Sequence, residues 1–171
     1  MRFRGPVLAD EHVDLVPVSG DDGVMVEARL GETVAATCAV APGHEPPGEP
    51  VGIRLDPLAL ELDDRWVGYA ARAGEDLQLY RTESIVHPVV WPSLANRIFA
   101  SQLVDGAWVH TRSEIRHLGL ARPGDAVLAE AFEVDRFESR SGERAVVDVR
   151  ISVDGRPVAA IEHEALVKLA R

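Results

Sequence analysis

The hydrophobic pattern of the first 41 residues has a period of two, which is the repeat of a β-strand. Residues 24–30 and 33–40 alternate in this way on either side of Gly31-Glu32, and a third run covers residues 13–18. A short glycine-containing link between two alternating runs favours a tight turn, so residues 24–40 are expected to form a β-hairpin. Residues 1–41 are therefore predicted to be rich in strands.

Four prolines interrupt this pattern between Pro42 and Pro50. Proline lacks a backbone donor and fixes its own φ angle, so such a stretch forms neither a helix nor a central strand. We interpret residues 42–50 as an extended linker. The sequence thus predicts three parts, namely a strand-rich segment 1–41, the linker 42–50 and a larger domain 51–171.

The pattern changes to helical spacing in the middle of the larger domain, after an extended stretch at residues 53–60. Asp63 or Asp64 can cap a short helix that stops near Gly74. A longer helix, from about Trp91 to Val104, follows Pro88. Its apolar positions lie on one face, which predicts a buried helix; they are Leu94, Ala95, Ile98, Phe99 and Leu103.

Period two returns after residue 108 and continues to the C-terminal end. Residues 108–117, 125–138, 144–153 and 157–169 are expected to be strands. Asp154-Gly155 separates the last two of these and is a strong signal for a two-residue hairpin turn. The residues expected on one side of the third strand are Val147, Val149, Ile151 and Val153.

Two short blocks of the N-terminal segment have counterparts in the C-terminal strands. Residues 1–11 resemble residues 115–125, and Gly31-Glu32-Thr33-Val34-Ala35-Ala36 resembles Gly155-Arg156-Pro157-Val158-Ala159-Ala160. Both blocks occur in the same order, so we interpret residues 1–41 as the strand-rich back half of a second, incomplete unit of the larger domain.

Composition narrows the possible functions. With 28 acidic against 18 basic residues, the net charge is −10, and the absence of a Lys/Arg-rich run argues against nucleic acid as a partner. Cys38 is the only cysteine, which excludes an internal disulfide and a cysteine-based metal site. The spacing of the histidines predicts no metal site. Without an apolar leader or a long apolar run, a cytoplasmic protein with no membrane contact is expected.

The segment before the longer helix carries candidate chemistry. It contains Gly74-Glu75-Asp76-Leu77-Gln78-Leu79-Tyr80 and then Val86-His87-Pro88. A glycine-acid turn, an aromatic residue five positions after the acid and a histidine before a buried helix resemble the active-site segment of MaoC-like (R)-specific enoyl-thioester hydratases. The block Glu114 to Asp125 is similar to the strand-and-turn element of the same family. This resemblance implies an α+β hot-dog fold, in which a curled antiparallel sheet wraps a long central helix. Together with the partial repeat at residues 1–41, it predicts a shortened double hot dog.

The resemblance also implies which residues carry the chemistry. Glu75 stands where the family has its aspartate, with Asp76 beside it, and Tyr80 stands where the family has its histidine. Hydration of an enoyl thioester needs one group that activates water and another that delivers a proton to the α carbon. Glu75 or Asp76 is expected to be the base, and His87 or Tyr80 to supply the proton or hold the carbonyl. Pro88 departs from the family's glycine and has no amide hydrogen.

The expected substrate is an acyl thioester on coenzyme A or a carrier protein, with no separate cofactor and no metal. Because Pro88 cannot donate, a backbone amide of Val89 or Val90 is expected to bind the thioester carbonyl. Trp91 and Asn96 on the longer helix are candidates for the acyl pocket. Arg112 is a candidate for a coenzyme A phosphate, together with Arg116 and Arg122.

The altered acid and histidine positions leave the reaction open. One hypothesis is a hydratase or dehydratase of fatty acid metabolism, and the second is a non-catalytic subunit that shapes the acyl pocket of an active partner. A hot-dog thioesterase is a third, disfavoured because residues 91–104 contain no acid. A lone curled sheet exposes its edge, so a homodimer or a heterodimer with a related hot-dog subunit is expected.

Overall fold

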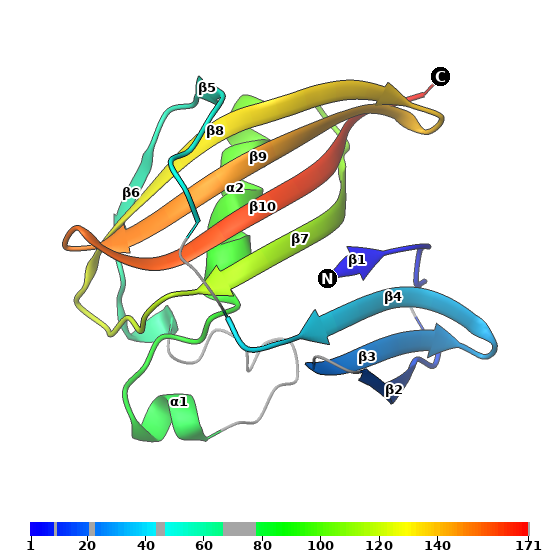
Figure 1. The fold of residues 1–171 in the computed structure, drawn as a ribbon, viewed down its shortest axis with the longest axis horizontal. Coiled ribbons are helices and arrows are strands. Elements are labelled where there is room, and N and C mark those ends of the chain that lie inside the picture. The colour runs from blue at the N-terminus through cyan, green and yellow to red at the C-terminus, as the bar shows by residue number, and fades with distance from the viewer. Residues whose placement is uncertain (9, 21–22, 44–46, 67–77, 171) are drawn as a thin grey trace.

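A computed structural model of the chain describes residues 1–8, 10–20, 23–43, 47–66 and 78–170 (Figure 1). Its dominant feature is one antiparallel sheet with the strand order β2-β3-β4-β1-β7-β10-β9-β8-β5, and β6 also pairs with β8. The strands are β1 (Arg2–Phe3), β2 (Asp14–Gly20), β3 (Gly23–Leu30), β4 (Thr33–Val40), β5 (Ile53–Arg54), β6 (Leu58–Glu61), β7 (Val109–His117), β8 (Ala126–Ser139), β9 (Gly142–Val153) and β10 (Arg156–Leu169).

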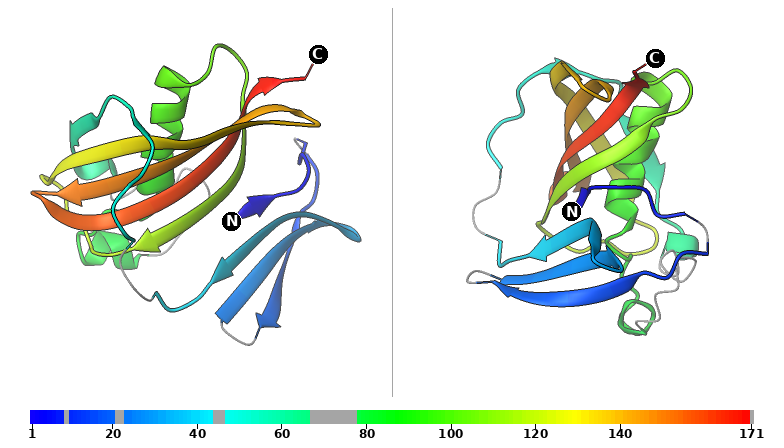
Figure 2. Two further views of the ribbon diagram at one scale, coloured as in Figure 1. Left: turned by 45° about the horizontal axis from the view of Figure 1, so that its top comes forward. Right: turned by 90° about the vertical axis from the view of Figure 1, so that its right-hand side faces the viewer.

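The longer helix, α2 (Val90–Gln102), lies across one face of β7–β10, and the sheet curls around it (Figures 1 and 2). Its main contacts with other elements are with β10 and β7. The helix buries one face completely, as its hydrophobic spacing predicts. The buried side chains of α2 are Val90, Trp91, Leu94, Ala95, Ile98 and Phe99.

Strand β9 supplies the sheet's side of this core. Its apolar residues alternate with half-exposed ones, as expected for a strand with one buried face. Asp154 and Gly155 follow β9 with φ angles of 48° and 77°, the left-handed values that a two-residue hairpin turn requires. The predicted turn is therefore confirmed, as are the strands on both sides of it. The buried residues of β9 include Ala145, Val147, Val149, Ile151 and Val153.

Strand β1 joins the N-terminal hairpin to the rest of the sheet. It is two residues long and pairs with β4 on one side and β7 on the other. Arg2 lies opposite both Thr37 and Arg112, and Ser113 exchanges backbone hydrogen bonds with Met1. The sheet thus continues without a break from the N-terminal segment into the larger domain.

The N-terminal hairpin has an apolar face that continues the face on which α2 packs. Phe3 lies opposite Ala36, and its ring contacts His110 on the α2 side of the sheet. Ala36 and Val40 share that face, and Val24 lies opposite Val40. Val24 and Val40 are 60% and 65% exposed. No helix in the described part of the chain covers this face (Figure 2).

The segment between β6 and α2 departs most from the sequence-based prediction. Asp64–Trp66 forms a single 3-10 turn, η1, whose Arg65 amide donates to Asp63 Oδ1 at 3.0 Å, so Asp63 caps this turn. The rest of the predicted short helix lies outside the described residues. A four-residue helix that was not predicted, α1 (Leu79–Thr82), follows.

None of the helices in the described part of the chain has the length and apolar character to span a membrane. The division at residues 42–50 stays a prediction.

Candidate functional site

The connection from α1 to α2 is fixed by hydrogen bonds at several points. The Ile85 amide donates to the Tyr80 carbonyl at 2.8 Å, which closes the turn after α1. The Val86 amide donates to the Ala121 carbonyl at 2.9 Å, and Val86 itself is buried. Arg122 also donates to the Glu83 carbonyl at 2.7 Å. This connection therefore presents His87 in a defined position just before α2.

The structure brings together two of the residues that the sequence singles out. The rings of Tyr80 and His87 pack edge to face, with centroids 4.3 Å apart and an interplanar angle of 61°. Both side chains are half-buried. Aromatic pairs favour this geometry because the positive edge of one ring meets the negative face of the other. The phenol and the imidazole are therefore held side by side at the beginning of α2.

The tautomer of His87 follows from its hydrogen bond to the backbone. Nδ1 lies 3.1 Å from the amide nitrogen of Val89, which donates to it. A ring nitrogen that accepts carries no proton, so neutral His87 has its hydrogen on Nε2. Imidazole in this form can donate through Nε2 to a substrate oxygen, and after protonation it can act as an acid.

The backbone amides at the start of α2 already donate hydrogen bonds to His87. The amide of Val89 donates to the His87 ring, and the amide of Val90 donates to the His87 carbonyl at 3.1 Å. The Trp91 side chain is buried against the sheet as part of the core. A role for Val89 or Val90 in binding a thioester carbonyl stays a prediction, and it requires that these hydrogen bonds be exchanged when the ligand binds.

Asn96 is one turn before Phe99 on α2, on the flank of the buried face. Its Oδ1 atom is buried and accepts no hydrogen bond. Phe99 stacks on Trp108 at 5.8 Å and meets His163 edge to face at 5.0 Å. A buried acceptor without a donor is unusual, and a ligand group or a water molecule commonly satisfies it. This supports the expectation that Asn96 borders an acyl pocket, which stays a prediction.

Sequence reasoning missed a polar network beneath α2. Ser113 Oγ on β7 lies 2.8 Å from Nε2 of His110 and 2.8 Å from Nδ1 of His163 on β10. The two imidazoles stack, with centroids 4.1 Å apart. Cross-strand pairing places His163 opposite Ser113, whereas His110 comes close through a bulge near Glu164. The inward positions of both strands were visible in the sequence, but the bulge that aligns His110 was not.

Burial keeps this network neutral. Desolvation, reinforced by the neighbouring His110, lowers the pKa of His163 from 6.5 to about 3. Burial lowers the pKa of His110 as well. His163 Nε2 is a second buried atom without a hydrogen-bond partner. Asn96 and His163 thus leave two unsatisfied polar atoms in the interior next to Phe99.

The other predicted residues lie apart from this region or cannot be placed. Glu75 and Asp76 lie outside the described residues. Arg112 is on β7 and pairs with Glu162 at 3.2 Å, on the face of the sheet away from α2. Arg116 is on the same strand, and both it and Arg112 pair with Glu114, at 3.4 and 3.6 Å. Among the described residues, no three His, Cys, Asp or Glu side chains are grouped so that they could hold a metal ion.

Solved structures with the same fold include hydratases and dehydratases. The chain is 18% identical to the (R)-hydratase from A. caviae involved in PHA biosynthesis, covering 70% of this chain and 98% of that one, with a TM-score of 0.57. It is 16% identical to the MaoC-like dehydratase from Rhodospirillum rubrum, covering 72% and 95%, with a TM-score of 0.52. A chain of the ChsH1-ChsH2 complex from Mycobacterium tuberculosis is 14% identical, covering 70% and 98%, with a TM-score of 0.57.

These similarities show the hot-dog fold. The fold is the one that the sequence predicts, and the three structures match 70–72% of the chain. No family model matches the chain, and no curated protein matches it.

Proposed function

We propose that this chain is an acyl-thioester hydratase or dehydratase of the MaoC-like type. It would add water to an enoyl thioester or remove it from a 3-hydroxyacyl thioester, carried on coenzyme A or a carrier protein. The observation that carries the proposal is the Tyr80–His87 pair at the start of the buried helix of a hot-dog fold. A proton donor held there lies beside the apolar interior that an acyl chain would need.

The proposed roles follow from the chemistry of hydration. A carboxylate of Glu75 or Asp76 takes a proton from water, and the resulting hydroxyl adds to the β carbon. His87 or Tyr80 delivers a proton to the α carbon or donates a hydrogen bond to the thioester carbonyl. His87 is the better proton carrier near neutral pH, because the reference pKa of a phenol is about 10 and that of imidazole about 6.5. Tyr80 suits the hydrogen-bonding role.

The test is hydration of crotonyl-CoA by the purified chain, followed by loss of the enoyl absorbance. Removing the catalytic base lowers the rate by about a hundredfold or more, so either Glu75→Gln or Asp76→Asn is expected to have that effect. Glu83→Gln is the matched control, since Glu83 is an exposed acid in the same region whose side chain makes no hydrogen bond to a described residue. Rates that stay unchanged in all three variants would rule out the acid mechanism.

One observation favours a second candidate function, that of a non-catalytic subunit in a shortened double hot dog. The uncovered apolar face of β2–β4 continues the face that α2 covers, and a second helix would cover it in a full repeat. A partner hot-dog subunit could supply that helix, and the ChsH1-ChsH2 structure is of a complex. In this case the chain alone binds crotonyl-CoA without turnover, and hydration appears when a purified MaoC-like subunit is added.

A further inference from the structure

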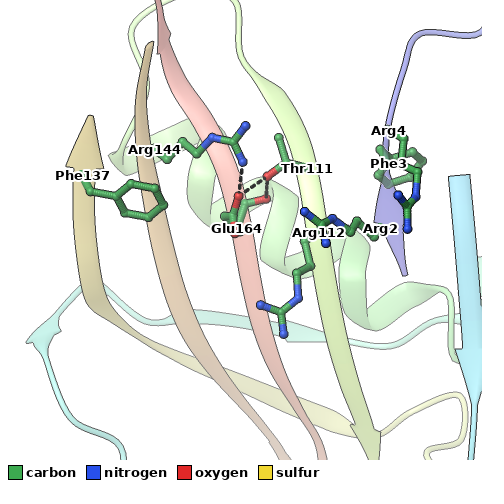
Figure 3. A pocket seen from close by; sticks show the side chains of 8 residues that line it. All are labelled: Arg2, Phe3, Arg4, Thr111, Arg112, Phe137, Arg144 and Glu164. Carbon is green, nitrogen blue, oxygen red and sulfur yellow. Dashed lines mark hydrogen bonds and ion pairs between the residues drawn. The ribbon is translucent and has the colours of Figure 1, made fainter. Parts of the chain in front are cut away.

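A cleft of about 500 Å³ opens on the face of the sheet away from α2, where β1 meets β7 (Figure 3). Arg112 and Glu164 lie opposite each other in register, and they point away from the face into which Ser113 and His163 are buried. The cleft is lined on one side by Arg2 and Arg4, and on the other by Arg144 and Phe137 (Figure 3). The Arg112 and Glu164 side of the cleft is therefore on the opposite face of the sheet from Ser113 and His163.

The lining of this cleft is basic although the protein as a whole is acidic. Four arginines line it against one acid, Glu164, in a chain with a net charge of −10. Glu162 and Glu114 partly neutralise Arg112 from outside the cleft, at 3.2 and 3.6 Å. Arg2 and Arg4 form no ion pair with any other described residue. Arg2 moreover lies directly opposite Arg112, and like charges opposite each other on neighbouring strands are unfavourable. An anion between them would remove that repulsion.

Arg144 is held in place by its neighbours. Glu164 Oε1 accepts hydrogen bonds from Arg144 and, at 2.9 Å, from the Thr111 hydroxyl, and Arg144 Nε donates to Ser139 Oγ at 3.2 Å. Burial tends to raise the pKa of Glu164, but the bonds from Thr111 and Arg144 outweigh it, so the pKa is lowered and the carboxylate stays charged. The Nη2 atom of Arg144 donates to no described residue. A guanidinium fixed through two of its nitrogens needs little further ordering to bind a ligand through the third.

A second cleft on the same face has the opposite character. It measures about 320 Å³ and is lined by more acids than arginines. The basic character of the first cleft thus does not extend along this face into the second. Phe137, 39% exposed, adds an apolar wall there. The acids of the second cleft are Glu49, Glu114, Asp148 and Glu162.

We propose that the basic cleft binds a small anion that carries a diphosphate, held by Arg2, Arg4 and Arg144. Arginine suits this chemistry because its planar fork can bind two phosphate oxygens at once. The cleft volume lies within the usual range for small ligands, roughly 300–1,000 Å³. Phe137 stands where a ring attached to the diphosphate would pack. This site is independent of the proposed thioester chemistry.

Isothermal titration calorimetry tests the proposal on the full chain, tagged at the C-terminal end so that β1 is undisturbed. The probes are inorganic pyrophosphate and ADP, at low ionic strength in a buffer without phosphate or sulfate. The double variant Arg2→Gln/Arg4→Gln is expected to weaken pyrophosphate binding about tenfold or more, equivalent to about 1.4 kcal/mol. Neither side chain makes an ion pair with another described residue, and Arg2 faces the like charge of Arg112, so the thermal unfolding midpoint should not fall.

Arg97→Gln is the matched control, because it removes the same charge from an exposed position on α2. If ADP binds more tightly than pyrophosphate, and Phe137→Ala removes this difference, the ligand is nucleotide-like. If the two probes bind equally, the ligand is recognised by its charge alone. The proposal is overturned if neither probe binds at millimolar concentration. It is equally overturned if the double variant binds as the parent does, or if Arg97→Gln weakens binding by the same factor.

Discussion

The imidazole of His163 stacks on that of His110 with ring centroids 4.1 Å apart, and the Ser113 hydroxyl lies between them. Two imidazolium ions at this distance would repel each other, and His163 is fully buried. The folded state therefore requires that this pair stay uncharged, whereas both rings take up protons freely once the chain unfolds.

Stability is accordingly expected to fall on acidification. The pKa of His163 is lowered to about 3 in the folded state, so between pH 6.5 and that value the unfolded chain binds the additional proton. The stabilisation from neutral His163 is complete above the pKa that this residue has in the unfolded chain, 6.5, and it is lost as the pH falls below that value. From pH 6.5 to 5, His163 alone should lower the free energy of unfolding by about 2 kcal/mol. Urea unfolding at the two pH values measures this change.

His163→Phe supplies the comparison for that experiment. Phenylalanine keeps a ring against Phe99 but cannot be protonated. Between pH 6.5 and pH 5, the free energy of unfolding of the variant should therefore fall by about 2 kcal/mol less than that of the parent. This holds even if the variant is more or less stable than the parent at both pH values. A pH dependence identical to that of the parent would show that His163 is not held neutral by the fold.

Asn96 and Gln102 are two amide side chains on one helix with different surroundings. Gln102 accepts from the Asp56 amide at 2.8 Å and donates to the Asp56 carbonyl at 2.9 Å, while Asn96 Oδ1 is buried without a partner. Gln102→Ala is expected to lower the free energy of unfolding by about 1 kcal/mol. Asn96→Ala should leave it unchanged or raise it, because it removes an unsatisfied buried acceptor.

The same pair of variants separates stability from activity. If Asn96 contacts the thioester, Asn96→Ala lowers hydration of crotonyl-CoA, and Gln102→Ala does not. A marked loss of stability in Asn96→Ala would mean that its oxygen has a partner in solution and is not kept open for a ligand. Chemical denaturation and the hydration assay on both variants give the answer.

Tyr80 contributes a ring and a hydroxyl, and two substitutions distinguish them. Tyr80→Phe keeps the edge-to-face contact with His87 and removes only the hydroxyl. If the hydroxyl binds the thioester, Tyr80→Phe is expected to lower kcat/KM by about tenfold or more, the value of roughly one hydrogen bond to a developing charge. If the ring merely positions His87, Tyr80→Phe is nearly neutral, and Tyr80→Leu lowers the rate.

Val24 and Val40 lie opposite each other on the uncovered face of the N-terminal hairpin. Substituting both by serine should change the free energy of unfolding by no more than about 0.5 kcal/mol, because both side chains are already exposed. Self-association of the purified chain, measured by light scattering, should decrease. Unchanged association together with a large loss of stability would show that another part of the chain covers this face.

Local patterns were enough to predict most of the strands and α2. The alternation in β9 and the Asp154-Gly155 turn depend on neighbouring residues only, so each could be inferred from the sequence. The extent of α2 followed from its apolar spacing, since Leu94, Ile98 and Phe99 repeat at three and four residues. The short helix α1 was missed because four residues carry too little periodicity.

The candidate site was predicted less completely, because it depends on contacts between distant segments. Tyr80 and His87 are close in sequence, and resemblance alone sufficed to single them out. The grouping of Arg2 and Arg4 with Arg144 depends on the insertion of β1 between β4 and β7, which no local pattern reveals. Of the three arginines that the sequence placed together, Arg112 and Arg116 share Glu114 as a partner, whereas Arg122 donates to the Glu83 carbonyl.

The two-residue strand β1 has a consequence for how the molecule opens. It is the narrowest point of the sheet, whereas β8, β9 and β10 pair along most of their length. Breaking a few backbone bonds at Arg2 and Met1 would release β2–β4 while α2 and its strands stay folded. In hydrogen–deuterium exchange, the amides of β3 and β4 should therefore exchange as a separate unit, earlier than those of β9.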